Sequence, residues 1–323
     1  MTDSNGLALR VAKMSAAFDR LSKGIGSGED IALLDEYQRS GQWLKDYEAD
    51  EAGLIPAGVN RSVLSQDGLY NLLQDLGHET IDTPARMTAL VTGASRGIGL
   101  AIARELADVG YNLALVARSA DALQTAKDEL CNAHPGIRVA TIAADLAQES
   151  SYSHIVAATV EEFGGVDLLV NCAGAAQQGS FTEVSPQQWD AIFAVNAKAP
   201  FFICKQALPY LEKSPKPIII NIASVVGFKG YIHQSVYASS KHALTGFTKV
   251  LAKEVQPLGI RVHLISPGGV ATEMVKQMRP DIAPDELLQP EEIAEIVRFL
   301  VTKKGRGTID QFYLRRFNSL AFD

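Results

Sequence analysis

The chain has 323 residues, which is enough for one large α/β domain together with a smaller module. Its formal net charge of −7 argues against nucleic acid or an anionic membrane surface as a partner. The three cysteines show no disulfide framework or metal-ligand spacing, the first residues lack the apolar core of a signal peptide, and no apolar run approaches the roughly 20 residues that span a bilayer. We therefore expect a cytoplasmic protein that binds no metal.

Residues 1–82 predict a small helical domain. The apolar residues Leu7, Val11, Met14, Phe18 and Leu21 recur every three or four positions, which is the spacing of one helix face. Further short helices are predicted in the segments IALLDEYQRS, GQWLKDYEADEAGLI and SQDGLYNLLQDL, and residues 83–86 are predicted to be a linker.

This N-terminal segment carries most of the negative charge of the chain. Up to Arg86 it has 14 acidic and 8 basic residues, a net charge of −6. Such a run is usually a solvated surface, and the alternative is a docking surface for a basic protein partner. The stretch from WLKDYEADEAGLIP to RSVLSQDGLYNLL resembles a small bacterial domain family of unknown function, and that resemblance implies no chemistry.

From residue 87 onward, short apolar runs alternate with helical patterns. Most runs are continuously apolar, as expected for strands that are buried on both faces of a parallel sheet. The runs are MTALV, NLALVA, RVATIAA, DLLVN, IIINIA, RVHLIS and DQFYL. We predict an α/β fold over residues 87–323, a Rossmann-like doubly wound parallel sheet of about seven strands, with the small α-helical extension at its N-terminus.

A glycine-rich turn, TGASRGIG, follows the first predicted strand and opens a helical pattern. Strand, glycine turn and helix together are the context of a dinucleotide-binding site. Gly93 can make the sharp turn, Gly97 lets backbone approach a pyrophosphate, and Gly99 lets the helix lie close to the strand. The N–H groups at the start of that helix would then face the phosphates.

The end of the second predicted strand indicates which dinucleotide binds. The run NLALVA continues into Arg118 and Ser119, where a site that prefers NAD would place a carboxylate for the ribose 2′-hydroxyl. Arg118 would instead attract a 2′-phosphate, and Arg96 could add a second positive charge. We expect NADP(H) rather than NAD; the alternative is that Arg118 is an ordinary surface charge.

Ser224, Tyr237 and Lys241 indicate the chemistry. Tyr237 and Lys241 are four residues apart in a predicted helix, which puts them on one face. We expect the ammonium to lower the tyrosine pKa from about 10, so that the phenol can exchange a proton with a substrate oxygen. Ser224 ends a predicted strand and could hold the same oxygen. The pair alone would fit any amphipathic helix, but the upstream glycine turn argues against that reading.

With both motifs in place, residues 87–323 resemble the short-chain dehydrogenase/reductase family. The segment NCAG, residues 171–174, is similar to the family's Asn-Asn-Ala-Gly, with Cys172 as a packing residue in place of the second asparagine. Asn196 matches the family's catalytic asparagine, which holds a water beside the lysine, and Asp145 matches the aspartate near the adenine. The segment PGGVAT, residues 267–272, resembles the one that contacts the nicotinamide.

The resemblance implies a complete set of site residues. The catalytic residues would be Asn196, Ser224, Tyr237 and Lys241. The cofactor site would comprise Gly93, Ser95, Arg96, Gly97, Ile98, Gly99, Arg118, Ser119, Asp145, Leu146, Asn171, Ala173, Gly174, Tyr237, Lys241, Pro267, Gly268, Val270 and Thr272. Apart from the resemblance, position along the chain predicts a substrate pocket of Val226, Phe228 and Tyr231 after Ser224, and of Met274 and Met278 in a short loop after Thr272 that could act as a lid.

These apolar residues favour a partly apolar substrate. The predicted function is NADP-dependent reduction of a ketone or aldehyde, by a carbonyl reductase similar to sepiapterin reductase or broader. A 3-oxoacyl thioester reductase and a 3-hydroxy-acid dehydrogenase are alternatives, and a nucleotide-sensing protein is an alternative of another class. The resemblance implies a homodimer or homotetramer. Where many family members carry a glycine-rich segment, this chain ends in TIDQFYLRRFNSLAFD.

Overall fold

The computed structural model describes residues 4–65, 68–75, 86–176, 178–305 and 307–320. The chain divides into two compact units, residues 1–85 and residues 86–323. Of the predicted linker, residues 83–85 lie outside the described part, and Arg86 belongs to the second unit. No helix in the described part of the chain is long and apolar enough to cross a membrane.

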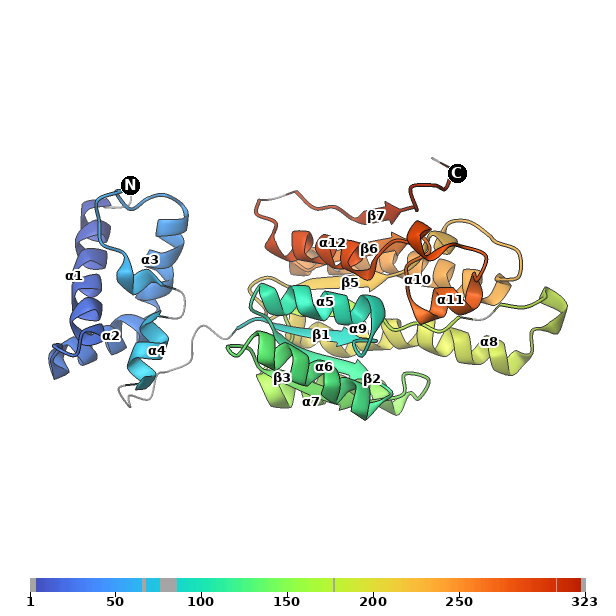
Figure 1. Ribbon diagram of the computed structural model, residues 1–323, viewed down its shortest axis with the longest axis horizontal. Helices are drawn as coiled ribbons and strands as arrows, with labels where there is room; N and C mark the ends of the chain where they lie inside the picture. The colour runs from blue at the N-terminus through green and yellow to red at the C-terminus, as the bar shows by residue number, and fades with distance from the viewer. Residues whose placement is uncertain (1–3, 66–67, 76–85, 177, 306, 321–323) are drawn as a thin grey trace. The chain divides into compact units, whose positions relative to one another are not determined.

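The N-terminal unit is helical, as predicted. A 3-10 turn at Ser62–Leu64 lies between its last two helices. Val11, Leu34, Val63 and Leu73 are completely buried in a core that this unit forms by itself. The α-helices in the described part of this unit are α1 (Ser4–Ser22), α2 (Gly28–Arg39), α3 (Gln42–Glu51) and α4 (Gly68–Asp75) (Figure 1).

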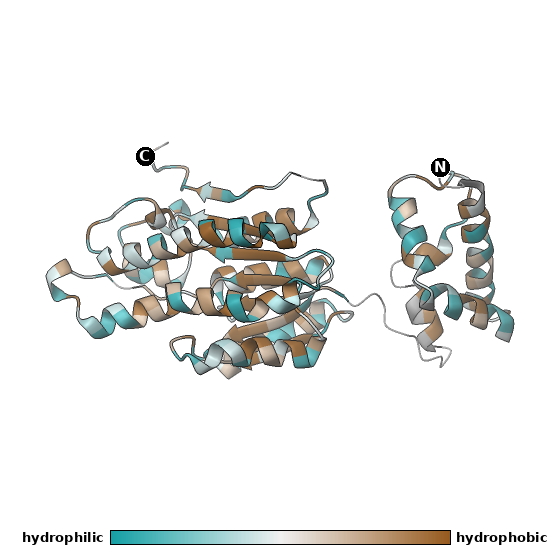
Figure 2. Cartoon of the chain, turned by 180° about the vertical axis from the view of Figure 1, so that it is seen from behind, coloured by the Kyte–Doolittle hydropathy of each residue, from teal (hydrophilic) through white to brown (hydrophobic). Residues whose placement is uncertain are grey.

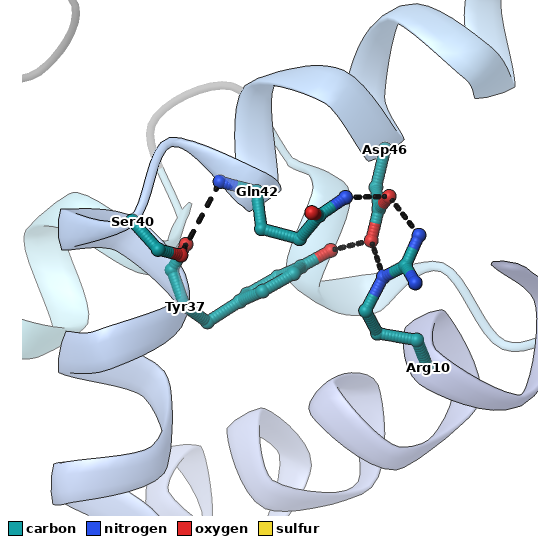
Figure 3. A network of polar contacts seen from close by, with 5 residues as sticks. All are labelled: Arg10, Tyr37, Ser40, Gln42 and Asp46. Carbon is teal, nitrogen blue, oxygen red and sulfur yellow. Dashed lines mark hydrogen bonds and ion pairs between the residues drawn. The ribbon is translucent and has the colours of Figure 1, made fainter.

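A buried carboxylate joins three of these helices (Figure 3). Asp46 of α3 is 1% exposed and accepts two hydrogen bonds from the Arg10 guanidinium of α1, at 2.8 and 2.7 Å. The Tyr37 hydroxyl of α2 and the Gln42 amide each donate to it at 2.8 Å. Burial alone would raise the pKa of Asp46, but the donors outweigh it and hold the pKa below its usual value.

Replacement of Asp46 should destabilise the N-terminal unit. We expect Asp46→Ala to lower its free energy of unfolding by about 3 kcal/mol, since the buried Tyr37 hydroxyl and the Arg10 guanidinium lose their partner. Urea unfolding followed by Trp43 fluorescence in a Trp189→Phe background measures this. The control is Asp50→Ala, which removes a more exposed ion pair and should cost at most about 1 kcal/mol. Equal losses in the two variants would contradict this account.

The second unit contains a seven-stranded parallel sheet, which confirms the predicted fold class. The strand order is β3-β2-β1-β4-β5-β6-β7, so β7 lies at an edge (Figure 1). All seven predicted apolar runs form strands, and β1, β4 and β5 consist only of buried residues. The strands are β1 (Thr88–Thr92), β2 (Asn112–Ala117), β3 (Val139–Ala143), β4 (Leu168–Asn171), β5 (Ile218–Ile222), β6 (Arg261–Pro267) and β7 (Gln311–Leu314).

Helices cover both faces of this sheet. One core lies between the sheet and α5 (Gly97–Asp108), α6 (Ala120–Ala133) and α12 (Pro290–Thr302). The other lies against α7 (Ser150–Phe163), α9 (Ala199–Leu211) and α10 (Ser235–Val255). The brown, hydrophobic colouring of the inner strands in Figure 2 agrees with burial on both faces.

The strand order reverses direction at β1. From there β2 and β3 follow on one side, and β4 to β7 follow on the other. In open parallel sheets ligands bind beyond the carboxyl ends of the strands at such a point. The helices α8 (Pro186–Phe193) and α11 (Glu273–Met278) lie beyond those ends (Figure 1). The site is therefore expected there.

Candidate active site

The glycine turn after β1 has the geometry that its sequence predicts. Gly93 and Gly97 have φ values of 72° and 56°, in the left-handed region. A Cβ at Gly99 would lie 2.2 Å from the Gly93 oxygen, so only glycine lets α5 start this close to the strand. No side chain caps the N-terminus of α5, which leaves its first N–H groups to a ligand. This cradle fits the phosphates of a dinucleotide.

Thr92, which we did not predict, ties this turn to the NCAG segment. Its hydroxyl accepts hydrogen bonds from the N–H groups of Cys172 and Ala173, at 3.0 and 3.2 Å. A Cβ at Gly93 would lie 2.9 Å from the Ala173 backbone, so the two loops are in contact. The only sequence signal was a hydroxyl residue directly before the first glycine.

Two cations border the turn. Arg96 precedes the first residue of α5, and Arg118 follows β2; both are exposed. Neither forms an ion pair with the described residues of the chain. Ser119 caps α6 by accepting the Ala122 N–H at 3.2 Å. An anionic group beyond the ends of β1 and β2 could therefore approach two exposed guanidinium groups.

The predicted adenine-side residues follow β3. Asp145 is exposed, and one of its carboxylate oxygens accepts the Ala147 N–H at 3.0 Å. Leu146 is 6% exposed and packs in the core beside α7. The Asp145 carboxylate is thus the more accessible of the two side chains.

Asn171 lies inside the sheet. Its amide donates to the Asn221 oxygen at 2.9 Å, and the Asn221 amide donates to the Thr248 hydroxyl at 2.9 Å. This chain of polar side chains joins β4, β5 and α10 through an otherwise apolar core. The Asn171 side chain therefore helps to fix α10 to the sheet.

A short π-helix at Ala194–Lys198 holds Asn196. Asn196 is completely buried. Its amide nitrogen donates to the Ala175 oxygen at 2.7 Å and to the Ser240 hydroxyl at 3.0 Å. Its side-chain oxygen accepts the Ala175 N–H at 2.8 Å. The π-helix turns Asn196 toward α10 and the NCAG loop. Such turns are frequent at functional sites.

The predicted serine, tyrosine and lysine converge at the ends of β5 and β6. Ser224 is 9% exposed and donates to the Pro267 oxygen at 3.4 Å. The Lys241 Nζ donates to the Ile222 oxygen at 3.0 Å and lies 5.9 Å from the centre of the Tyr237 ring. All three side chains thus meet beyond the carboxyl end of β5.

Burial shifts both titrating groups, and one shift corrects our expectation. Burial raises the pKa of Tyr237 to about 12, and a hydrogen bond with Ser224 only partly offsets it. The prediction that Lys241 lowers the pKa of Tyr237 is therefore wrong. The Lys241 ammonium donates its hydrogen bond to the Ile222 oxygen instead. Burial lowers the pKa of Lys241 itself to about 8.

Cys172 is a packing residue. Burial raises the pKa of its thiol to about 12, so it stays protonated and is a poor nucleophile at neutral pH. Within the described part of the chain, no group of three His, Cys, Asp or Glu residues could hold a metal ion.

The predicted pocket residues divide into two sets. Val226 and Met278 are 3% and 8% exposed, and Phe228 packs edge-on against Tyr313 of β7. Tyr231, by contrast, is 40% exposed. A fifth residue, Met274, lies beside the catalytic residues: a Cβ at Gly174 would lie 3.8 Å from its Cε, 3.8 Å from the Lys241 Nζ and 3.6 Å from the Asn196 oxygen.

The loop after β6 closes the site. The Gly268 N–H donates to the Leu314 oxygen at 2.7 Å, and Val270 forms a bridge with Leu288. Thr272 caps α11, and its methyl group would lie 3.2 Å from a Cβ at Gly97. The loop therefore reaches from the end of the sheet to the glycine turn.

The burial of Lys241 should cost stability. We expect Lys241→Met to raise the free energy of unfolding at pH 7 by about 2 kcal/mol, since the depressed pKa costs about 3 kcal/mol and the lost hydrogen bond offsets about 1. The unfolded lysine holds its proton to about pH 10.4, but the folded one loses it near pH 8, so the gain shrinks as pH rises between these values.

Urea unfolding at pH 7 and pH 9.5 measures this gain. The control Lys253→Met changes an exposed lysine on the same helix and should alter stability little. A Lys241→Met protein that is less stable than wild type at pH 7 would contradict the account.

Comparison with known proteins identifies the family of each part of the chain. Residues 87–283 match the family described as short chain dehydrogenase, and residues 10–82 match a domain of unknown function (DUF4298). The chain belongs to the short-chain dehydrogenase family, and its second unit is an oxidoreductase that acts on alcohol and carbonyl groups.

Relatives in this family carry several names. The D-beta-hydroxybutyrate dehydrogenase of Rhizobium meliloti is 36% identical over 235 residues, 72% of this chain and 89% of that protein. The 3-oxoacyl-(acyl-carrier-protein) reductase of Aquifex aeolicus is 32% identical, over 67% of this chain and 90% of that protein. The alcohol dehydrogenase of Thermococcus sibiricus, solved with 5-hydroxy-NADP, is 30% identical with a TM-score of 0.68, over 73% of this chain and 99% of that one.

Proposed function

We propose that this protein reduces a ketone or aldehyde to an alcohol with NADPH. The observation that carries the proposal is the convergence of Ser224, Tyr237 and Lys241 beside the glycine cradle. When bound, NADPH supplies the hydride. Tyr237 donates the proton to the carbonyl oxygen, and Ser224 orients that oxygen. Buried Lys241 fixes α10 to the end of β5, and buried Asn196 joins α10 to the loop at Ala175.

The pKa of Tyr237 supports reduction as the direction of work. A phenol with a pKa near 12 is protonated at neutral pH, so it can donate a proton to the developing alkoxide. Arg96 and Arg118, both exposed, support NADP(H) over NAD, since each can approach a 2′-phosphate. The L-sorbose reductase of Gluconobacter frateurii, a relative with 28% identity, was solved in complex with NADPH and L-sorbose.

The charges of the lid favour a neutral substrate. Each basic side chain of residues 273–289 pairs with a carboxylate: Lys276 with Glu273 at 2.8 Å, and Arg279 with Asp281 at 2.7 Å. These cations are therefore neutralised before a substrate carboxylate or phosphate could meet them. The second candidate is a 3-hydroxy-acid dehydrogenase, which the similarity to D-beta-hydroxybutyrate dehydrogenases favours.

An assembly of two or four copies is also proposed. A groove of about 580 Å³ lies over the outer side of the π-helix, α9 and α10, and is lined by the aromatic residues Phe193, Phe201, Phe202 and Phe247. Phe201 is 45% exposed there, and the exposed Trp189 stacks on Phe193. A second copy would cover this apolar surface.

The cytoplasmic location, the roles of the two domains and a partner of the acidic N-terminal unit stay predictions.

NADPH consumption by the full-length protein across a panel of carbonyl compounds tests the proposal. The panel includes small diketones, aromatic ketones, a pterin ketone, 3-oxo acids and a 3-oxoacyl thioester. Turnover of neutral ketones well above that of 3-oxo acids supports the proposal. Preference for the 3-oxo acids would favour the second candidate, and no turnover at all despite NADPH binding would defeat both.

Removal of one hydroxyl group should stop catalysis. We expect Tyr237→Phe to lower kcat by about 10²- to 10⁴-fold, because the proton donor is lost, and to leave the Kd for NADPH unchanged. Steady-state rates and fluorescence titration of NADPH measure the two effects. The control Tyr210→Phe changes a tyrosine near the end of α9 and should retain most of the rate. Near-normal turnover by Tyr237→Phe would refute the assigned role.

Loss of one arginine should change the cofactor preference. We expect Arg118→Ser to raise the Kd for NADPH by about 10- to 100-fold and to leave the Kd for NADH little changed. This factor corresponds to the free energy of one hydrogen bond between charged groups. Arg138→Ser is the control, since Arg138 pairs with Glu162 on the surface. An Arg118→Ser protein that keeps the wild-type ratio of the two Kd values would show that Arg118 is only a surface charge.

A further inference from the structure

The chain's last described residues form an ordered turn after β7. The Arg315 guanidinium donates to the carbonyl oxygens of Arg316, Phe317 and Ser319, at 3.1, 2.8 and 2.8 Å. The Ser319 hydroxyl donates to the Arg316 oxygen at 2.7 Å. We call residues 315–319 the C-terminal turn. Its own side chains define its shape, so it can serve as an anchor.

This turn lies against the loop that follows β6. A Cβ at Gly268 would lie 3.3 Å from the Leu314 oxygen and 3.5 Å from the Arg316 nitrogen. A Cβ at Gly269 would lie 3.6 Å from the Arg316 Cδ and 3.0 Å from the Leu287 Cδ2. The C-terminal turn, the loop after β6 and the base of the lid therefore meet at Gly269.

Arg316 connects the turn to the lid, residues 273–289. Its Nη1 lies 3.1 Å from a carboxylate oxygen of Glu286, and its side chain is 19% exposed. The hydrogen bond from Arg279 is the main cause of the lowered pKa of Asp281, and the charge of Arg316 lowers it further. Arg316 thus faces two carboxylates of the lid.

In the other ion pairs of the lid, both partners belong to the lid itself. Lys276 pairs with Glu273 and Arg279 pairs with Asp281, so both pairs stiffen the lid without attaching it to the sheet. Within the described residues, the pair between Arg316 and Glu286 is the one that joins the lid to another part of the fold. Its loss would leave the base of the lid held by the backbone bonds of Leu288 with Gly269 and Ala271 and by apolar packing.

We propose that Arg316 is a positioning residue for catalysis, which clamps the base of the lid to the C-terminal turn. The lid carries Met274, which lies beside Gly174, Asn196 and Lys241. The clamp therefore sets where the apolar side chains of the lid meet a substrate. This kinetic role rests on the proposed carbonyl reduction, whereas the ordering of the lid does not.

Arg316→Met tests the clamp, because it removes the charge and keeps an aliphatic side chain against Gly269. We expect the KM for the carbonyl substrate to rise about fivefold, the factor that corresponds to a strong exposed ion pair. We expect kcat to change less and the Kd for NADPH to stay the same. Backbone amides of residues 279–289 should exchange hydrogen faster. Arg316→Lys should restore most of the wild-type behaviour, and Glu286→Gln should reproduce the loss.

Arg298→Met is the matched control, since Arg298 pairs with Glu105 at 3.0 Å between α12 and α5. It should change neither the KM nor the exchange of the lid. If Arg316→Met leaves both unchanged, or shifts both only as Arg298→Met does, the clamp is refuted. If the wild-type protein reduces no carbonyl compound, the proposed function fails, while the exchange measurement still decides whether Arg316 orders the lid.

Discussion

The buried ammonium of Lys241 is the constraint on which the site depends. An ionisable group that is 4% exposed needs a fixed partner, and it finds one in the Ile222 carbonyl at the end of β5. On the same helix, the Thr248 hydroxyl accepts a hydrogen bond from Asn221, which in turn accepts one from Asn171. The helix α10 is thus fixed to the sheet through Lys241 and through Thr248. Tyr237 of the same helix therefore has little freedom to move away from Ser224.

This arrangement shows which parts of the molecule the sequence could predict. The strands were predictable because most of the seven runs are continuously apolar, as strands of a parallel sheet covered on both faces must be. The glycine turn was predictable because only glycine tolerates the observed φ values and contacts. The proposed catalytic residues Ser224, Tyr237 and Lys241 were predicted from spacing and resemblance, and the structure brings them to one end of the sheet.

Other features depend on contacts between distant residues. The Asn196 side chain, which lies in a π-helix, makes hydrogen bonds to Ala175 and Ser240 that no local sequence pattern encodes. The direction of the Tyr237 shift was predicted wrongly because spacing shows proximity to an ammonium but does not show the depth of burial. The ion pair between the C-terminal turn and Glu286 gave no signal either, since it joins residues about 30 positions apart.

Transfer of deuterium tests the central claim, that a hydride passes to a carbonyl carbon under control of this site. The preferred ketone of the panel would be reduced with each of the two NADPH stereoisomers that carry deuterium at C4. The account predicts that one stereoisomer places deuterium on the carbinol carbon of the alcohol and slows the reaction, while the other does neither. An alcohol without deuterium from either stereoisomer, formed while NADPH is consumed, would contradict the account.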